Sequence, residues 1–172
     1  MRAGHPWLFA DSVHRQNRAG KSGELAVLYD RQDRFLAVGL FDPDSPIRVR
    51  ILHTGKPLTI DRDWWSARLD AAIKLRNGLF DQQTTGHRWI NGESDGWPGL
   101  VLDRYDATLV LKLYTAAWLP RLEETVGLIN EQLQNERIVL RLSRNISKTA
   151  ERQFKLGNGK ILHGSPLAEP VI

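Results

Sequence analysis

Short apolar runs separated by turn residues fill the first part of the chain and constrain its fold most strongly. Residues 24–30 (ELAVLYD) and 34–41 (RFLAVGLF) are apolar at nearly every position, which favours strands buried on both faces. The polar residues 30–33 between them favour a tight hairpin connection. Short strands with turn residues between them predict a compact β-barrel over residues 1–60.

A third run, IRVRIL, alternates strictly between apolar and basic residues. Successive side chains of a strand point to opposite faces, so the apolar side chains are expected to point into the barrel and the basic ones out of it. The residues expected inside are Ile47, Val49 and Ile51, and those expected outside are Arg48 and Arg50.

From residue 61 onward the apolar positions recur at helical spacing. They fall on one side of a 3.6-residue repeat, which predicts a connecting helix over residues 61–80. Asp61 and Asp63 stand where a helix N-terminus favours negative charge. The apolar residues on this side are Trp65, Leu69, Ala72, Ile73 and Phe80.

Residues 81–172 alternate between strand-like and helix-like segments, and we expect them to form a second domain. Strands are predicted for RWINGE, GLVLDRYD and TLVLKLY, followed by an amphipathic helix over residues 119–133. The segments RIVLRLS and KILHG are then expected to return to strand. The fold class predicted for the whole chain is therefore α+β, with a β-barrel followed by a small strands-helix-strands domain.

Positive charge gathers toward the two ends of the sequence. The chain has a net charge of +4, with nine Lys/Arg against six Asp/Glu in residues 1–60 and seven against two in residues 137–172. Residues 61–136 carry eight against twelve. Clustered cations suit a polyanionic partner, because phosphate attraction sums over neighbouring charges.

Cysteine is absent from the sequence, and no apolar run approaches the length of a membrane span. Disulfides, thiolate metal sites and cysteine nucleophiles are therefore excluded within this chain. The expectation is a cytoplasmic protein that does not bind a membrane.

Three stretches together resemble a known enzyme family. GHPWLF at residues 4–9, VGLFDPDSPIRVRIL at residues 38–52 and RWINGESDGWPGLVLDRYD at residues 88–106 resemble the PUA-domain, class I S-adenosylmethionine-dependent 23S rRNA (cytosine-5) methyltransferases. The third stretch is the most specific, although Trp97 stands where relatives usually have leucine. The resemblance implies a PUA-like RNA-binding barrel, a central α+β domain and, beyond residue 172, a Rossmann-like catalytic domain.

This resemblance implies that the chain is the RNA-binding and substrate-positioning portion of such an enzyme. Its expected partner is large-subunit (23S) rRNA, and a homodimer is possible. S-adenosylmethionine is implied for the full-length protein but not for this chain, which shows no Gly-rich strand-turn-helix segment. We expect no catalytic, cofactor-binding or metal-binding residues within it.

Basic residues and one tryptophan are the candidate RNA contacts. Arg144, Lys148, Arg152 and Lys155 recur at intervals of four, four and three, so they form one cationic stripe if residues 145–155 are helical. Cations in the loop before the first barrel strand and on the third strand are expected to contact phosphate. They are Arg18, Lys21, Arg48 and Arg50, and Trp97, on a presumed loop tip, is expected to stack on a base.

Two other functions fit parts of the sequence. A free-standing PUA-type RNA-binding adapter would need the same basic residues and no catalytic domain. A small carboxylate-dependent hydrolase would use Glu93, Asp95 and Asp103 as acid, base or metal ligands. The histidines show no metal-ligand spacing; they are His5, His14, His53, His87 and His163.

The missing cysteine leads to a first prediction. Methylation at cytosine carbon 5 in this family is understood to need a cysteine thiolate that adds to the neighbouring ring carbon. Because the chain has no cysteine, the purified 172-residue protein should transfer no methyl group to rRNA. A radiolabelled methyl-transfer assay checks this, and turnover above background would contradict it.

Overall fold

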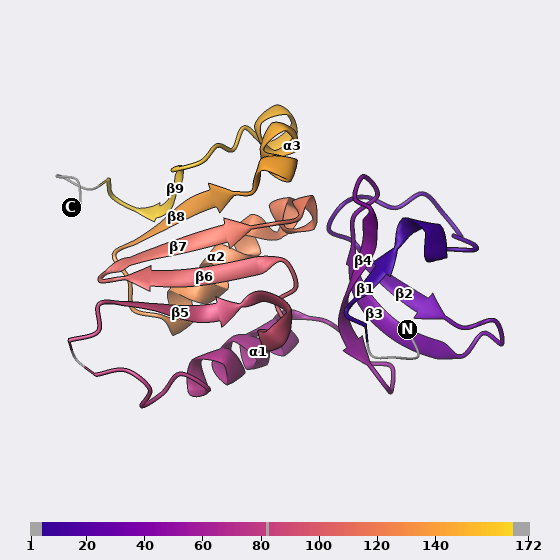
Figure 1. The fold of residues 1–172 in the computed structure, drawn as a ribbon, viewed down its shortest axis with the longest axis horizontal. Coiled ribbons are helices and arrows are strands. Elements are labelled where there is room, and N and C mark those ends of the chain that lie inside the picture. The colour runs from indigo at the N-terminus through magenta and orange to yellow at the C-terminus, as the bar shows by residue number, and fades with distance from the viewer. Residues whose placement is uncertain (1–4, 82, 167–172) are drawn as a thin grey trace.

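The chain folds around two β-sheets that lie side by side in the computed structural model (Figure 1). The structure describes residues 5–81 and 83–166. The first sheet is antiparallel with strand order β1-β4-β3-β2. Its strands are β1 (Trp7–Phe9), β2 (Leu25–Tyr29), β3 (Phe35–Phe41) and β4 (Ile47–Thr54), with a short 3-10 helix η1 (Ala10–Ser12) after β1.

The three strands predicted for this half are confirmed, and β1 is an addition. Three residues are too few for a periodicity signal, so β1 is recognised only through its pairing with β4. Within the described residues, β1 and β2 stand at opposite edges of the sheet, without the pairing that would close it into a barrel.

The orientation predicted for Arg50 is wrong. Arg50 pairs across the sheet with Trp7 on one side and Leu40 on the other, and cross-strand partners share a face. That face packs against the second half of the chain, so Arg50 is only 7% exposed. Alternation along a strand separates the two faces, but it does not tell which of them meets solvent.

The connecting helix α1 (Arg62–Lys74) is shorter than the predicted 61–80. The side chain of Asp61 accepts a hydrogen bond from the Trp64 amide at 2.9 Å, which caps the helix as its sequence indicates. The helix ends six residues before Phe80, in turns that include Gly78 with a left-handed φ of 77°. Phe80 instead stacks on His87.

The second sheet has strand order β5-β6-β7-β8-β9, and the pair β7 and β8 is parallel. The strands and the α-helix predicted for this half are confirmed, although the helix starts at Leu122 rather than 119, after a 3-10 turn that contains Pro120. The strands are β5 (Gly86–Asn91), β6 (Leu100–Tyr105), β7 (Thr108–Leu113), β8 (Arg137–Leu142) and β9 (Ile161–Gly164). The other elements are η2 (Gly92–Asp95), η3 (Ala116–Arg121), α2 (Leu122–Gln132) and α3 (Arg144–Phe154).

Three tryptophan rings pack together at the centre of the core. Trp97 is 1% exposed, and its ring centroid lies 4.9 Å from that of Trp65 and 5.7 Å from that of Trp118. The prediction of an exposed Trp97 at a loop tip is therefore wrong. Gly96 and Gly99 have left-handed φ values of 76° and 72°. The turns at these glycines direct Trp97 inward, against Trp65 and Trp118.

The burial of Trp97 gives a prediction about stability. Trp97→Ala should lower the free energy of unfolding by about 3–5 kcal/mol, because it opens a large cavity between two other indoles. Urea denaturation followed by circular dichroism measures this loss, and Leu79→Ala, at a side chain 66% exposed, serves as the control. A loss below about 1 kcal/mol for Trp97→Ala would show that the ring is not a core anchor.

A partly buried polar cluster joins the two sheets. Glu93, in η2, accepts a hydrogen bond from the Trp7 indole nitrogen at 2.8 Å and pairs with the Arg50 guanidinium at 3.0 Å. Burial lowers the pKa of Arg50, and the negative charges of Glu93 and Asp42 oppose that shift. Asp42 in turn accepts a 2.6 Å hydrogen bond from the Thr115 hydroxyl. These contacts hold the first sheet on the end of the second.

Removing Glu93 should therefore weaken the whole fold. Glu93→Ala leaves the Arg50 guanidinium buried without its nearest counter-charge, which should cost about 2–3 kcal/mol of unfolding free energy. Glu93→Gln keeps one acceptor oxygen and should lose less. The control is Glu136→Ala, at an exposed carboxylate, which should change stability by about 0.5 kcal/mol or less. Equal small effects for all three in guanidinium unfolding would contradict the role given to Glu93.

Candidate nucleic-acid interface

Helix α3 carries the cationic stripe that its sequence predicts. Ile146 and Ala150 are buried on the inner side of the helix. The four predicted cations lie on the opposite side, all exposed, and none forms an ion pair with another described residue. They are Arg144, Lys148, Arg152 and Lys155, and Glu151 is the acid beside them. The helix therefore presents an excess of positive charge to solvent.

The loop before β2 lies on the other side of η3 from α3. Arg121 donates a 2.8 Å hydrogen bond from Nε to the Gly23 carbonyl, which fixes this loop on η3. Gly23 has a φ of 84°, and a Cβ there would lie 2.7 Å from the Ala117 carbonyl oxygen, so the close approach requires glycine. Helix α3 also contacts η3, and Figure 1 shows η3 between α3 and the first sheet.

This arrangement brings some of the predicted cations to one side of the molecule. Arg18 and Lys21 are exposed on the loop that η3 holds, while the stripe of α3 lies across η3 from them. Arg18 is partly neutralised by Glu24 at 2.9 Å. The hydrogen bond from the Lys21 backbone, with the Arg18 contact, lowers the pKa of Glu24. Arg48 is half-buried on β4, and Arg50 and Trp97 lie inside the protein.

The three carboxylates considered for hydrolysis are each bound to a different arginine. Glu93 pairs with Arg50, as described above. Asp95 pairs with Arg76 at 2.6 Å and also accepts the Asn91 amide. Asp103 binds Arg88 through two hydrogen bonds of 2.7 and 3.1 Å, which raise the pKa of Arg88. Carboxylates committed to separate structural pairs do not form an acid–base dyad, so the structure gives the hydrolase alternative no support.

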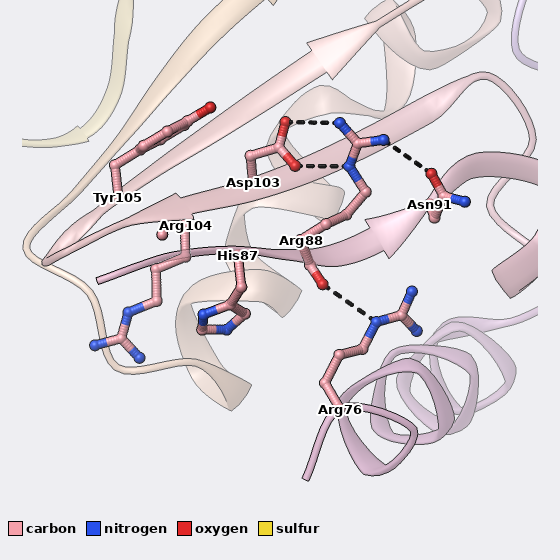
Figure 2. A pocket seen from close by; sticks show the side chains of 8 residues that line it. Arg76, His87, Arg88, Asn91, Asp103, Arg104 and Tyr105 are labelled. Carbon is pink, nitrogen blue, oxygen red and sulfur yellow. Dashed lines mark hydrogen bonds and ion pairs between the residues drawn. The ribbon is translucent and has the colours of Figure 1, made fainter. Parts of the chain in front are cut away.

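A hollow at the edge strand β5 was missed by the sequence analysis. Its volume is about 540 Å³, and Figure 2 shows Arg88, Asp103 and Tyr105 on one side of the strands with His87 and Arg104 on the other. Arg76 closes the edge of the strand by donating from Nε to the Arg88 carbonyl at 3.2 Å. The remaining lining residues are Gly86 and Asn91. These residues come from the turn after α1 and from β5 and β6, so only the folded chain brings them together.

His87 contributes little charge to this hollow. Burial, with the nearby positive charge of Arg104, lowers the pKa of His87 below its usual value. Its ring lies between Phe80, stacked at 4.5 Å, and Trp89, edge-on at 4.5 Å. The imidazole is therefore expected to be neutral at pH 7 and to act as part of an aromatic cluster.

The residues present do not fit S-adenosylmethionine. In α/β proteins, a nucleotide-like cofactor binds at the carboxyl ends of parallel strands. The parallel strands β7 and β8 are therefore the place to look for such a site, at the carboxyl end of β7. Here that end is filled by Thr115, Ala117 and Trp118, none more than 1% exposed, and the turn contains no glycine. Among residues 5–81 and 83–166, no group of acids and histidines is arranged to hold a metal ion. None of the helices described is long and apolar enough to span a membrane.

Comparison with known proteins gives the chain its relatives. Residues 1–54 match the model of a PUA-like domain. The chain is 52% identical to a ribosomal RNA large subunit methyltransferase of Deinococcus radiodurans, covering 100% of this chain and 43% of the relative. It is 32% identical to ribosomal RNA large subunit methyltransferase I of Aliivibrio fischeri, again covering 100% of this chain and 43% of the relative. The chain thus spans less than half the length of these relatives.

Solved structures show the same fold. A proposed SAM-dependent methyltransferase from Streptococcus mutans superposes with a TM-score of 0.77 at 15% identity, covering 98% of this chain and 41% of the other. A second proposed methyltransferase, solved in complex with SAH, gives a TM-score of 0.76 at 16% identity and covers 98% of this chain and 40% of the other. By sequence, the chain is similar to ribosomal RNA large subunit methyltransferases over less than half of their length, and its residues 1–54 match a PUA-like domain.

Proposed function

We propose that this chain binds large-subunit rRNA and positions it for a class I S-adenosylmethionine-dependent methyltransferase domain. The reaction proposed is methylation of cytosine at carbon 5. The cofactor and the nucleophile for that reaction would come from outside this chain, since its sequence has no cysteine and residues 5–81 and 83–166 form no fitting cofactor site. In this proposal, the chain supplies affinity for rRNA and orients the rRNA toward the methyltransferase domain.

The observation that carries the proposal is the pair of cationic segments on either side of η3. The stripe of α3 and the loop with Arg18 and Lys21 come from different halves of the chain, but both α3 and the loop contact η3. Phosphate contacts determine how a protein lies on a folded nucleic acid, and they require cations held at defined separations. Cations on a helix and on an anchored loop meet this requirement better than cations on free segments.

The join between the sheets supports the same proposal. Glu93, Arg50 and Trp7 hold the PUA-like half against the second half, so the two groups of cations keep one relative placement. A PUA-like domain is also a module that binds RNA largely through shape and backbone contacts. In this proposal, RNA lies across η3 and contacts both halves.

Neutralising the α3 stripe tests the proposal. Each phosphate contact adds about 0.7–0.9 to the slope of log affinity against log salt concentration. The variant Arg144→Gln, Lys148→Gln, Arg152→Gln, Lys155→Gln should lower that slope for a structured rRNA fragment by about 2–3 and weaken binding at low salt. Filter binding at several salt concentrations measures both quantities.

A control variant with the same change in net charge distinguishes the effect of the α3 stripe on RNA binding from the effect of total charge. Glutamine at Arg31, Lys56, Arg62 and Lys74 removes four exposed cations that belong neither to α3 nor to the loop before β2, and of these Arg62 and Lys74 are paired with Glu131 and Asp70. This control should retain most of the slope of the parent. If both variants lower the slope equally, binding depends only on total charge, and the α3 stripe has no special part in it.

A further inference from the structure

No helix among the described residues covers one face of the second sheet. Figure 1 shows α2 passing behind the sheet, and the residues that face it are buried, as at Leu109, Leu111 and Ile138. The opposite face carries the residues that alternate with these. Two of its cross-strand rows are Asp103–Val110–Val139 and Val101–Lys112–Arg141. Most of these side chains are half-buried or exposed, so the face is open to a partner.

Two exposed tyrosines belong to this open face. Tyr105, at the end of β6, is 57% exposed and borders the hollow beside Arg88 and Asp103 (Figure 2). Tyr114, just after β7, is 40% exposed, and the Lys112 ammonium lies 4.9 Å from the centre of its ring. Exposed aromatic rings on a sheet, next to cations, are the groups on which proteins stack unpaired RNA bases.

The charge on this face favours a nucleic acid. Lys112 and Arg141 are neighbours on β7 and β8, and neither forms an ion pair with another described residue. The acid in these rows, Asp103, is already paired with Arg88. Arg141 also stands three residues before Arg144, where the cationic stripe of α3 begins. The open face is therefore close in sequence to the surface proposed to hold rRNA.

We propose that the open face of the second sheet binds an unpaired RNA segment, with bases stacked on Tyr105 and Tyr114 and the phosphates held by Lys112 and Arg141. This inference rests on the proposed rRNA-binding function and assigns it a single-stranded site. An unpaired strand fits better than a duplex, because the base faces of a duplex are already stacked on each other. The hollow of about 540 Å³ beside Tyr105 is large enough for one nucleotide, with Arg88 and Asp103 on the same side of the strands as Tyr105.

The test compares two RNA probes and two tyrosine variants. The probes are an unstructured RNA of about 12 nucleotides and a duplex of the same sequence. The double variant Tyr105→Leu, Tyr114→Leu keeps apolar bulk but removes the rings. The control is Tyr29→Leu, because Tyr29 is 58% exposed, as much as Tyr105, but lies on β2 in the first sheet. A 2-aminopurine base in the single strand reports stacking through quenching of its fluorescence.

The double variant should bind the single strand at least about ten-fold more weakly than the parent and lose the quenching, with its duplex affinity unchanged. Tyr29→Leu should behave as the parent does.

If the double variant binds and quenches like the parent while the α3 variant loses affinity, this inference fails and the proposed function stands. If the parent binds neither these RNAs nor structured rRNA, both fail. If the double variant changes only self-association in analytical ultracentrifugation, the face is a contact between copies and the inference is overturned.

Discussion

The contact that Glu93 makes with Trp7 and with the buried Arg50 joins the two halves of the protein. Arg50 comes from the middle of β4 and Glu93 from η2, so the pair joins segments that are 43 residues apart in the chain. A guanidinium in a largely apolar interface is tolerated only with a counter-charge and hydrogen bonds, and Glu93 supplies both. The requirement for this pair determines how the first sheet lies on the second.

This contact keeps the cation-bearing loop of the first half and the cation-bearing helix of the second half in one relative placement. The loop that carries Arg18 and Lys21 belongs to the PUA-like half, and α3 belongs to the other half. Their common support, η3, fixes them only while the halves stay together through Glu93 and through the hydrogen bond from Thr115 to Asp42. Residues 88–106, the most specific of the three stretches that resemble the family, supply Glu93 to the contact between the two halves and Arg88 and Asp103 to the hollow at β5.

The elements were predictable from sequence because their signals are local. The alternation in β4, the helical spacing in α2 and the Asp61 cap each depend on residues a few positions apart. The errors at Arg50 and Trp97 have a different origin. Both residues meet partners from distant segments, and a sequence pattern does not show that the second face of a strand is covered or that a loop folds inward. The hollow at β5 was missed for the same reason, since Arg76 lies in the turn after α1, Arg88 in β5 and Tyr105 in β6.

Amide chemical-shift mapping of the chain with a structured rRNA fragment is the sharpest test of RNA binding across η3, because it reports where RNA lies as well as whether it binds. We expect the shifted amides to gather in α3 and in the loop around Lys21, on both sides of η3. The hairpin between β2 and β3 and the exposed side of α1 should remain unchanged. Shifts confined to those two regions, or no shifts at low salt, would contradict the account.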